Sequence, residues 1–125
     1  NFGHTVGHAL EAVLGYRRLL HGEAISIGMV SAALLGELQG ITPGGTAEQI
    51  AGSLRALGLP IALPHDVRFE DLLGVMTRDK KARDGQVRFV LITRIGQAHL
   101  PVAVNEKEII DALSVHREKF GNGTA

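Results

Sequence analysis

The sequence predicts a mainly α-helical domain with one small β-hairpin. Apolar residues recur at helical spacing through most of the chain, and the run from 23 to 38 is apolar on nearly all sides. Only two short segments, near residues 90 and 100, have the alternating composition of strands around a glycine turn. The 125 residues, 45% of them hydrophobic, are enough for a single packed domain.

Five helical segments are expected, each bounded by glycine, proline or a polar capping residue. They cover residues 5–14, 23–38, 46–57, 69–77 and a last segment that runs from 105 through 113. The longest, 23–38, is predicted to be the central buried helix. Thr46 with Gln49, and Asn105 with Glu108, have the spacing of a capping box at a helix start.

Strands are expected at 87–93 and 98–104, with Gly96 between them as the turn of the hairpin. The segment 78–85 that precedes them is polar and rich in charge. The last five residues, 121–125, are expected to be a disordered tail. Residues 1–120 would then form the folded domain.

The composition excludes several classes of partner. The chain carries 13 basic and 13 acidic side chains, whereas nucleic-acid-binding domains and domains that bind anionic membranes usually show a basic excess. No apolar run approaches the roughly 18 residues of a membrane span. Cysteine is absent, which fits a reducing compartment. We therefore expect a cytoplasmic protein without nucleic-acid or membrane partners.

Candidate chemistry is concentrated in the first 23 residues, which contain His4, His8, Glu11 and His21. The four-residue spacing of His4 and His8 places them on one face of a helix, with Glu11 on the same side. Neutral imidazole is a common zinc ligand. Two histidines at this spacing are also often incidental surface residues, and the sequence alone leaves both interpretations open.

Glycines accompany these histidines. Gly3 and Gly7 leave the helix surface bare beside His4 and His8, and Gly22 does so beside His21. A missing Cβ allows close approach by a ligand or by another backbone. These glycines strengthen the case for a functional site.

The remaining ionisable residues favour structural roles. Glu11 and Glu23 are expected to have structural roles. One such role is to accept a hydrogen bond from a histidine and so orient its ring. Three further histidines have no supporting neighbours and are expected at the surface: His65, His99 and His116.

Several segments together resemble the C-terminal domain of the 3-dehydroquinate synthase family. They are NFGHTVGHALEA from Asn1, HGEAISIGM from His21, RDKKARDG from Arg78 and VRFVL from Val87. The resemblance covers nearly the whole chain, in order and with similar spacing. It implies the C-terminal helical domain of a dehydroquinate-synthase-like fold.

The resemblance also implies an activity. Members of this family are NAD- and zinc-dependent lyases of the shikimate pathway. They convert 3-deoxy-D-arabino-heptulosonate 7-phosphate to 3-dehydroquinate and phosphate, at a site between this domain and an N-terminal NAD-binding domain. That N-terminal domain is absent from this chain, so the chain alone is expected to be inactive. A homodimer is expected for the parent protein.

Residue roles follow from the resemblance by position. His4 and His21 match the two histidine ligands of zinc, and cobalt is compatible with the same donors. The third ligand in the family is a glutamate upstream of Asn1, which this chain lacks.

Four residues are candidates for three positions that handle substrate. His8 matches a histidine of substrate binding and proton transfer, and Asn1 matches an asparagine that contacts substrate. The phosphate-side and catalytic lysine falls on the pair Lys80-Lys81, which the sequence does not separate.

Three alternatives remain. One is a related sugar-phosphate cyclase, another a metal-dependent polyol dehydrogenase of similar fold, and the third a non-catalytic zinc-binding helical module. The coding DNA upstream of Asn1 distinguishes a two-domain synthase from the non-catalytic module. An in-frame extension of about 200 residues, one further domain, with a glycine-rich nucleotide turn supports the synthase. A start codon just before Asn1 supports the module.

Overall fold

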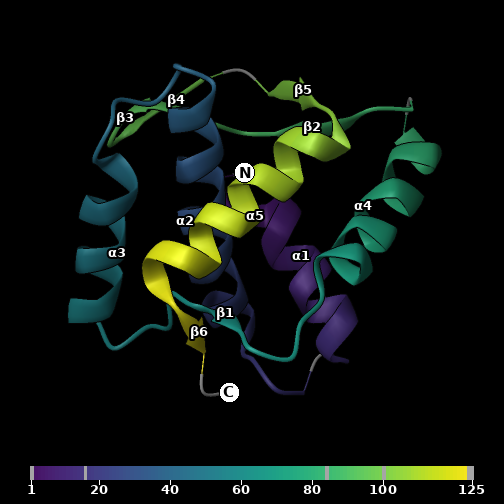
Figure 1. The fold of residues 1–125 in the computed structure, drawn as a ribbon, viewed down its shortest axis with the longest axis horizontal. Helices are drawn as coiled ribbons and strands as arrows, with labels where there is room; N and C mark the ends of the chain where they lie inside the picture. Colours follow the sequence, from purple (N-terminus) through teal and green to yellow (C-terminus); the bar gives the residue numbers. More distant parts are fainter. Residues whose placement is uncertain (1, 16, 84, 100, 124–125) are drawn as a thin grey trace.

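The computed structural model describes residues 2–15, 17–83, 85–99 and 101–123, with the backbone alone described for 79–83 and 122–123. Five helices dominate it, as the sequence predicts (Figure 1). They are α1 (His4–Leu14), α2 (His21–Leu38), α3 (Thr46–Ala56), α4 (Phe69–Arg83) and α5 (Glu106–Phe120). In the described part of the chain, no helix is both long enough and apolar enough to cross a membrane.

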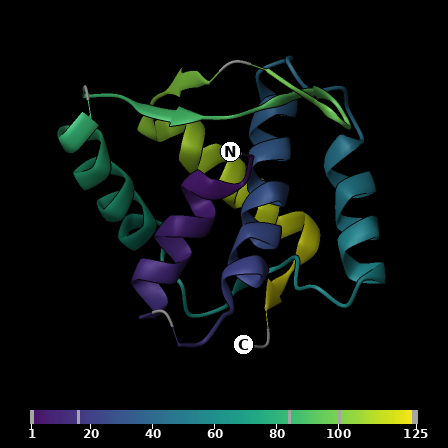
Figure 2. The ribbon, with the colours of Figure 1, turned by 180° about the vertical axis from the view of Figure 1, so that it is seen from behind.

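The centre of the fold is α2. Helices α1, α3 and α5 pack against it, and α4 packs against the far side of α1 (Figure 2). One apolar cluster fills the space between α1, α2, α4, α5 and the strands, and a second lies between α2, α3 and α5. Side chains of α2 enter both clusters, which explains why this helix is apolar on nearly all sides.

The predicted hairpin is present, as two short antiparallel ladders. Its four strands are β2 (Val87–Phe89), β3 (Ile92–Arg94), β4 (Gln97–Ala98) and β5 (Val102–Val104). β2 pairs with β5 and β3 pairs with β4. Between the ladders, the amide of His99 donates to the carbonyl of Leu91 at 2.7 Å. The strands are shorter than expected, and the pairing register shifts within the second ladder, between Ile92 and Arg94.

Helix α4 is longer than predicted. It continues to Arg83, so most of the polar segment 78–85 is helical. The apolar periodicity fades after residue 77, so the sequence pattern predicts a helix that ends there. Arginine, lysine and alanine nevertheless have high helix propensity, and no glycine or proline interrupts them before Gly85.

One of the two predicted capping boxes is wrong. The N-cap of α3 is Gly45, whose φ is 90°, and Thr46 is the first helical residue. The cap is the carboxylate of Glu37 from α2, which accepts from the amides of Gly45 and Ala47 at 3.2 and 2.8 Å. A capping group from a different helix leaves no local sequence signal.

The second capping box is confirmed. The Asn105 side chain accepts from the amide of Glu108 at 2.9 Å, and the Glu108 carboxylate accepts from the amide of Asn105 at 2.9 Å. These reciprocal bonds satisfy amides at the start of α5 that have no partner within the helix.

A pair of strands that the sequence analysis did not predict lies at the end of the chain. β1 (Leu63–Pro64) pairs in parallel with β6 (Asn122–Gly123). The backbone at 122–123 is therefore paired, which differs from the disordered tail expected from residue 121 onward. Residues 124–125 lie outside the described residues.

The expected surface position of His116 is wrong, whereas His65 and His99 are exposed as expected. His116 is fully buried and joins three segments. Its Nε2 lies 2.6 Å from the carbonyl oxygen of Ile61, and its Nδ1 lies 2.6 Å from the Ser31 hydroxyl. The spacing of Ile109, Leu113 and His116 along the buried face of α5 is the signal that could have placed it inside.

Burial lowers the pKa of His116 from 6.5 to about 4, because the charged form loses its hydration. The imidazole is therefore neutral at pH 7. With the proton on Nε2, the ring donates to Ile61, and Nδ1 accepts from the Ser31 hydroxyl. Both nitrogens are satisfied, as buried polar atoms require.

Glycines allow α1 and α2 to approach closely. A Cβ added to Gly28 would overlap the carbonyl oxygen of Gly3 and lie 2.8 Å from the amide nitrogen of Gly7. A Cβ added to Gly7 would lie 3.1 Å from the carbonyl oxygen of Ala24. The close approach expected at Gly3 and Gly7 is confirmed, and the approaching group is the backbone of α2. Gly22 faces open space.

We expect Gly28→Ala to lower the free energy of unfolding by about 1–3 kcal/mol, because the new methyl group must push α1 away from α2. Urea denaturation measures the change. The matched control is Gly52→Ala in α3, where nothing lies within 4 Å of the added Cβ. That substitution should raise the free energy of unfolding by about 0.5–1 kcal/mol. Equal effects of the two substitutions would contradict the close contact.

Stability should also depend on pH through His116. Its folded pKa of about 4 lies below the ordinary histidine value of 6.5, so the unfolded chain takes up the proton first as the pH falls. The stabilisation contributed by the buried, neutral His116 is fully present above pH 6.5 and is lost as the pH falls toward 4. Over that interval we expect the free energy of unfolding to fall by roughly 3 kcal/mol. Urea denaturation at a series of pH values should show a flatter dependence for His116→Gln than for the unsubstituted chain.

Candidate metal and substrate site

The two histidines predicted as metal ligands lie side by side. His4 is the first residue of α1 and His21 is the first residue of α2. Their ring centroids are 5.7 Å apart and the ring planes are inclined by 61°. Two imidazoles bound to one tetrahedral zinc ion, with Zn–N distances of about 2.0–2.1 Å, have ring centres about 5 Å apart. The observed spacing therefore fits two ligands of one metal ion.

The backbone at the start of α1 determines where His4 lies. Gly3 is the N-cap of the helix and has a φ of 83°. It lies so close to Ile25 and Met29 of α2 that there is no space for a Cβ. The adjacent His4 is half-buried, and its Nδ1 lies 3.4 Å from the carbonyl oxygen of Phe2. The close contact of the two helices thus holds the imidazole of His4 near the start of α2.

His21 contacts a carboxylate from α1. Its Nδ1 lies 3.0 Å from Oε1 of Glu11, which is 8% exposed, whereas the His21 side chain is 61% exposed. Glu23 has a different task, because its carboxylate accepts from the amide of Leu20 at 2.8 Å and so caps α2. The structural role expected for Glu23 is confirmed. The hydrogen bond of Glu11 fits the expected orienting role.

The described residues bring two candidate metal ligands together and do not form a complete site. Across residues 2–15, 17–83, 85–99 and 101–123, no group of three His, Cys, Asp or Glu side chains is arranged to hold a metal ion. His8 is exposed on α1, one turn after His4. The donor set thus fits zinc only when a further ligand comes from outside the described part of the chain.

Of the other predicted substrate residues, the structure describes the backbone of the lysine pair. Asn1 lies outside the described residues. Lys80 and Lys81 occupy the C-terminal part of α4, where the structure describes the backbone alone. Helix α4 packs against α1, as both ribbon views show (Figures 1 and 2). The lysine pair is therefore carried by a helix that is a direct neighbour of the helix bearing His4 and His8.

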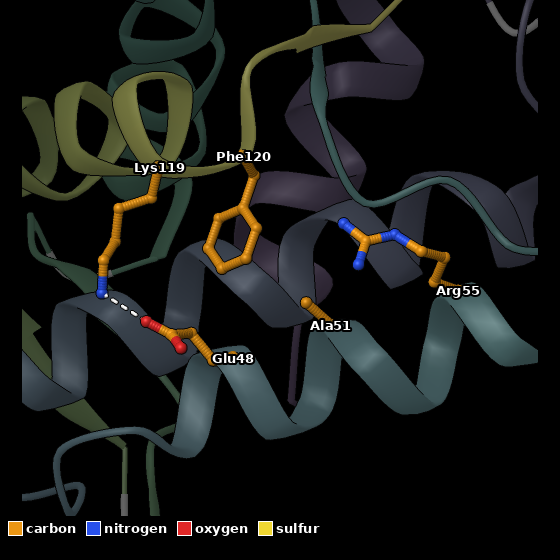
Figure 3. Close-up of a pocket in the computed structure, with 5 residues that line it drawn as sticks. All are labelled: Glu48, Ala51, Arg55, Lys119 and Phe120. Atoms are coloured by element: carbon orange, nitrogen blue, oxygen red, sulfur yellow. Dashed lines mark hydrogen bonds and ion pairs between the residues drawn. The ribbon is translucent and has the colours of Figure 1, made fainter.

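A separate open cavity of about 400 Å³ lies between α3 and α5 (Figure 3). Its lining residues are Glu48, Ala51, Arg55, Lys119 and Phe120. Lys119 forms an ion pair with Glu48 at 2.9 Å across it. None of the predicted site residues lines this cavity, and its charges are largely paired with each other. It is not part of the histidine site.

Comparison with known sequences identifies the family. The family model described as 3-dehydroquinate synthase C-terminal matches residues 1–82. The chain belongs to the 3-dehydroquinate synthase family. It is 45% identical over 94% of its length to the 3-dehydroquinate synthase of Vibrio atlanticus, and 42% identical over 95% to that of Dichelobacter nodosus. In both cases it spans 32% of the relative, which is about a third of the length of these curated enzymes.

Solved structures show the same fold. The 2-epi-5-epi-valiolone synthase of Streptomyces hygroscopicus, solved with NAD⁺ and Zn²⁺ bound, superposes with a TM-score of 0.80 and is 28% identical. The match covers 94% of this chain and 32% of that one. A 2-deoxy-scyllo-inosose synthase gives a TM-score of 0.77 at 22% identity, over 92% of this chain and 34% of its own. The predicted C-terminal helical domain is confirmed.

Zinc should bind weakly to this chain, and at the lowest zinc concentrations it should bind to His4 and His21. In a zinc titration at pH 8, we expect the imidazole NMR signals of these two residues to shift together, because one ion contacts both rings. His4→Ala or His21→Ala should abolish the shift of the remaining partner. His65→Ala, on an exposed loop, is the matched control and should leave both shifts intact. Similar responses from all the exposed histidines would contradict a specific site.

Proposed function

We propose that this chain is the metal- and substrate-binding part of a 3-dehydroquinate synthase. The reaction converts 3-deoxy-D-arabino-heptulosonate 7-phosphate to 3-dehydroquinate and phosphate. The observation that carries the proposal is the pairing of the His4 and His21 rings at 5.7 Å. It occurs in a chain that is 42–45% identical, over 94–95% of its length, to enzymes named for this activity.

His4 and His21 would hold the metal ion. When bound, zinc supplies a Lewis acid that polarises a substrate oxygen and lowers the pKa of a coordinated hydroxyl group. Cobalt is compatible with the same nitrogen donors. A glutamate from a segment upstream of Asn1 would complete the ligand set.

His8 would bind substrate and move a proton. It lies on the same face of α1 as His4, one turn further along, and its side chain is exposed. An exposed imidazole with access to both nitrogens can give up a proton from one and accept a proton at the other near neutral pH. In this proposal His8 touches the substrate while His4 touches the metal ion.

Asn1 and one of the lysines Lys80 and Lys81 would orient the substrate. A lysine ammonium group holds a phosphate dianion as a compact positive charge. An asparagine side chain can both donate to and accept from sugar hydroxyl groups. The packing of α4 against α1 supports a contribution of both helices to one substrate site.

The cofactor NAD would be held mainly by another domain of the parent protein. Within the described residues, no strand leads through a glycine-rich turn into a helix, which is the usual arrangement for binding a dinucleotide. The chain spans about a third of its curated relatives, which leaves room for such a domain. A homodimer and a cytoplasmic location complete the proposal.

The choice of substrate rests on the degree of similarity. The chain is 42–45% identical to 3-dehydroquinate synthases but 28% identical to the 2-epi-5-epi-valiolone synthase. The heptulosonate phosphate is therefore favoured over the substrate of another sugar-phosphate cyclase.

The decisive experiment uses the longer protein that carries this chain. We expect it to release phosphate from the heptulosonate phosphate in the presence of NAD and zinc. His4→Ala and His21→Ala should each remove zinc and abolish phosphate release, because each deletes a ligand. His8→Ala should keep zinc and lose about 10²–10⁴-fold in rate, the usual contribution of a positioned acid–base group. Zinc content by atomic absorption and phosphate release measure the two effects.

Two controls accompany these variants. The 125 residues alone should show no turnover, because this proposal assigns NAD binding and the third metal ligand to other segments of the parent protein. His99→Ala, at an exposed position on the hairpin, should leave zinc content and rate unchanged. Equal zinc content in the His4, His8 and His21 variants would overturn the division of roles.

A further inference from the structure

A nearly buried carboxylate contacts an exposed imidazole beside the proposed metal. Glu11 of α1 is 8% exposed, and among the described residues His21 is its hydrogen-bond partner. The His21 side chain is 61% exposed. The hydrogen bond therefore joins a buried acceptor, Oε1 of Glu11, to a solvent-exposed ring, that of His21.

This arrangement is costly for a purely structural contact. Burying a carboxylate is unfavourable unless hydrogen bonds compensate the lost hydration. An imidazole that is mostly exposed can be satisfied by water and needs no protein acceptor. The burial of Glu11 is therefore explained if its carboxylate serves to orient the His21 ring rather than to stabilise the fold.

Helix capping does not explain Glu11. The carboxylate of Glu23 already accepts from the amide of Leu20 at the start of α2. Glu11 lies on another helix, seven residues after His4, and such positions share one helix face. His4 and Glu11 therefore both reach His21 from the same side of α1, and the ring of His21 contacts both.

We propose that Glu11 is a positioning residue that keeps the proton of neutral His21 on Nδ1. Nδ1–H then donates to Oε1 of Glu11, and the lone pair of Nε2 is left free for a metal ion shared with His4. The inference rests on the proposed function for the identity of the metal site. The tautomer and orientation of His21 are properties of the chain itself.

The same principle governs many metal sites. Which nitrogen of a histidine binds a metal is decided by the hydrogen bond that the other nitrogen makes. Without Glu11, the neutral imidazole of an exposed histidine favours the proton on Nε2, the nitrogen that the metal would need. Removal of the acceptor should therefore change the tautomer even where the fold is unchanged.

The experiment measures the tautomer of His21 in the 125-residue chain by ¹⁵N–¹H correlation NMR at pH 8, without metal. The test variant is Glu11→Met, which keeps the volume and helix propensity of the side chain and suits a buried position. Glu11→Gln retains an acceptor oxygen and is the conservative variant. Glu23→Gln is the matched control, because it removes a carboxylate two residues from His21 that contacts the backbone instead of the ring.

We expect the Nδ1–H form of His21 to dominate in the unsubstituted chain and in Glu23→Gln, and the Nε2–H form to dominate in Glu11→Met. Zinc titration should then show an apparent dissociation constant raised about 10–100-fold in Glu11→Met. Glu11→Gln should fall between the two. A role limited to stability would shift the urea midpoint of Glu11→Met and leave the tautomer unchanged.

Failure of this inference and failure of the proposed function give different results. The same His21 tautomer in the unsubstituted chain and in Glu11→Met overturns the positioning role, whatever zinc does. Conversely, a tautomer change in Glu11→Met together with no zinc effect on His4 and His21 of the unsubstituted chain supports Glu11 as the group that fixes the ring. That result would count against the two-histidine metal site.

Discussion

The backbone contact between α1 and α2 is the constraint on which the site depends. Gly3, Gly7 and Gly28 bring the two helices to a separation that no larger residue at Gly28 permits. The histidines that begin these helices then have ring centres 5.7 Å apart. At Gly28 the neighbouring atoms all belong to the backbone of Gly3 and Gly7, which cannot repack as side chains can. The spacing of the two rings is therefore determined by main-chain geometry, which is stiffer than side-chain packing.

Several groups around this contact fix the start of α2. His21 begins α2, and α2 is buried on several sides. The position of His21 therefore depends on a helix that is packed in the core. Glu11 reaches that start from α1, and Glu23 caps it from within α2. The His21 ring is thus oriented by one hydrogen bond to its own Nδ1, whereas the start of its helix is capped separately, at the amide of Leu20.

The sequence predicted the helices, the hairpin and the histidine pair, because periodicity, glycine boundaries and motif spacing are local signals. It missed features that depend on segments distant in the chain. The partners of His116, Ser31 and Ile61, are far away in sequence, and the local signal for its burial was its helical spacing from Ile109 and Leu113. α4 was ended too early because its last turns have helix propensity without apolar periodicity. Asn1, Lys80 and Lys81 were predicted from family resemblance, and their roles remain predictions.

The carboxylate of Glu37 shows how two helices can make opposite demands on one residue. An acidic side chain in the last turn of α2 opposes the dipole of that helix, whose C-terminal end is negative. The same carboxylate favours the positive N-terminal end of α3, where it accepts from two amides. A designer who optimised α2 alone would replace Glu37 with lysine and would remove the cap of the next helix. Redesign of this domain therefore has to treat α2 and α3 as one unit.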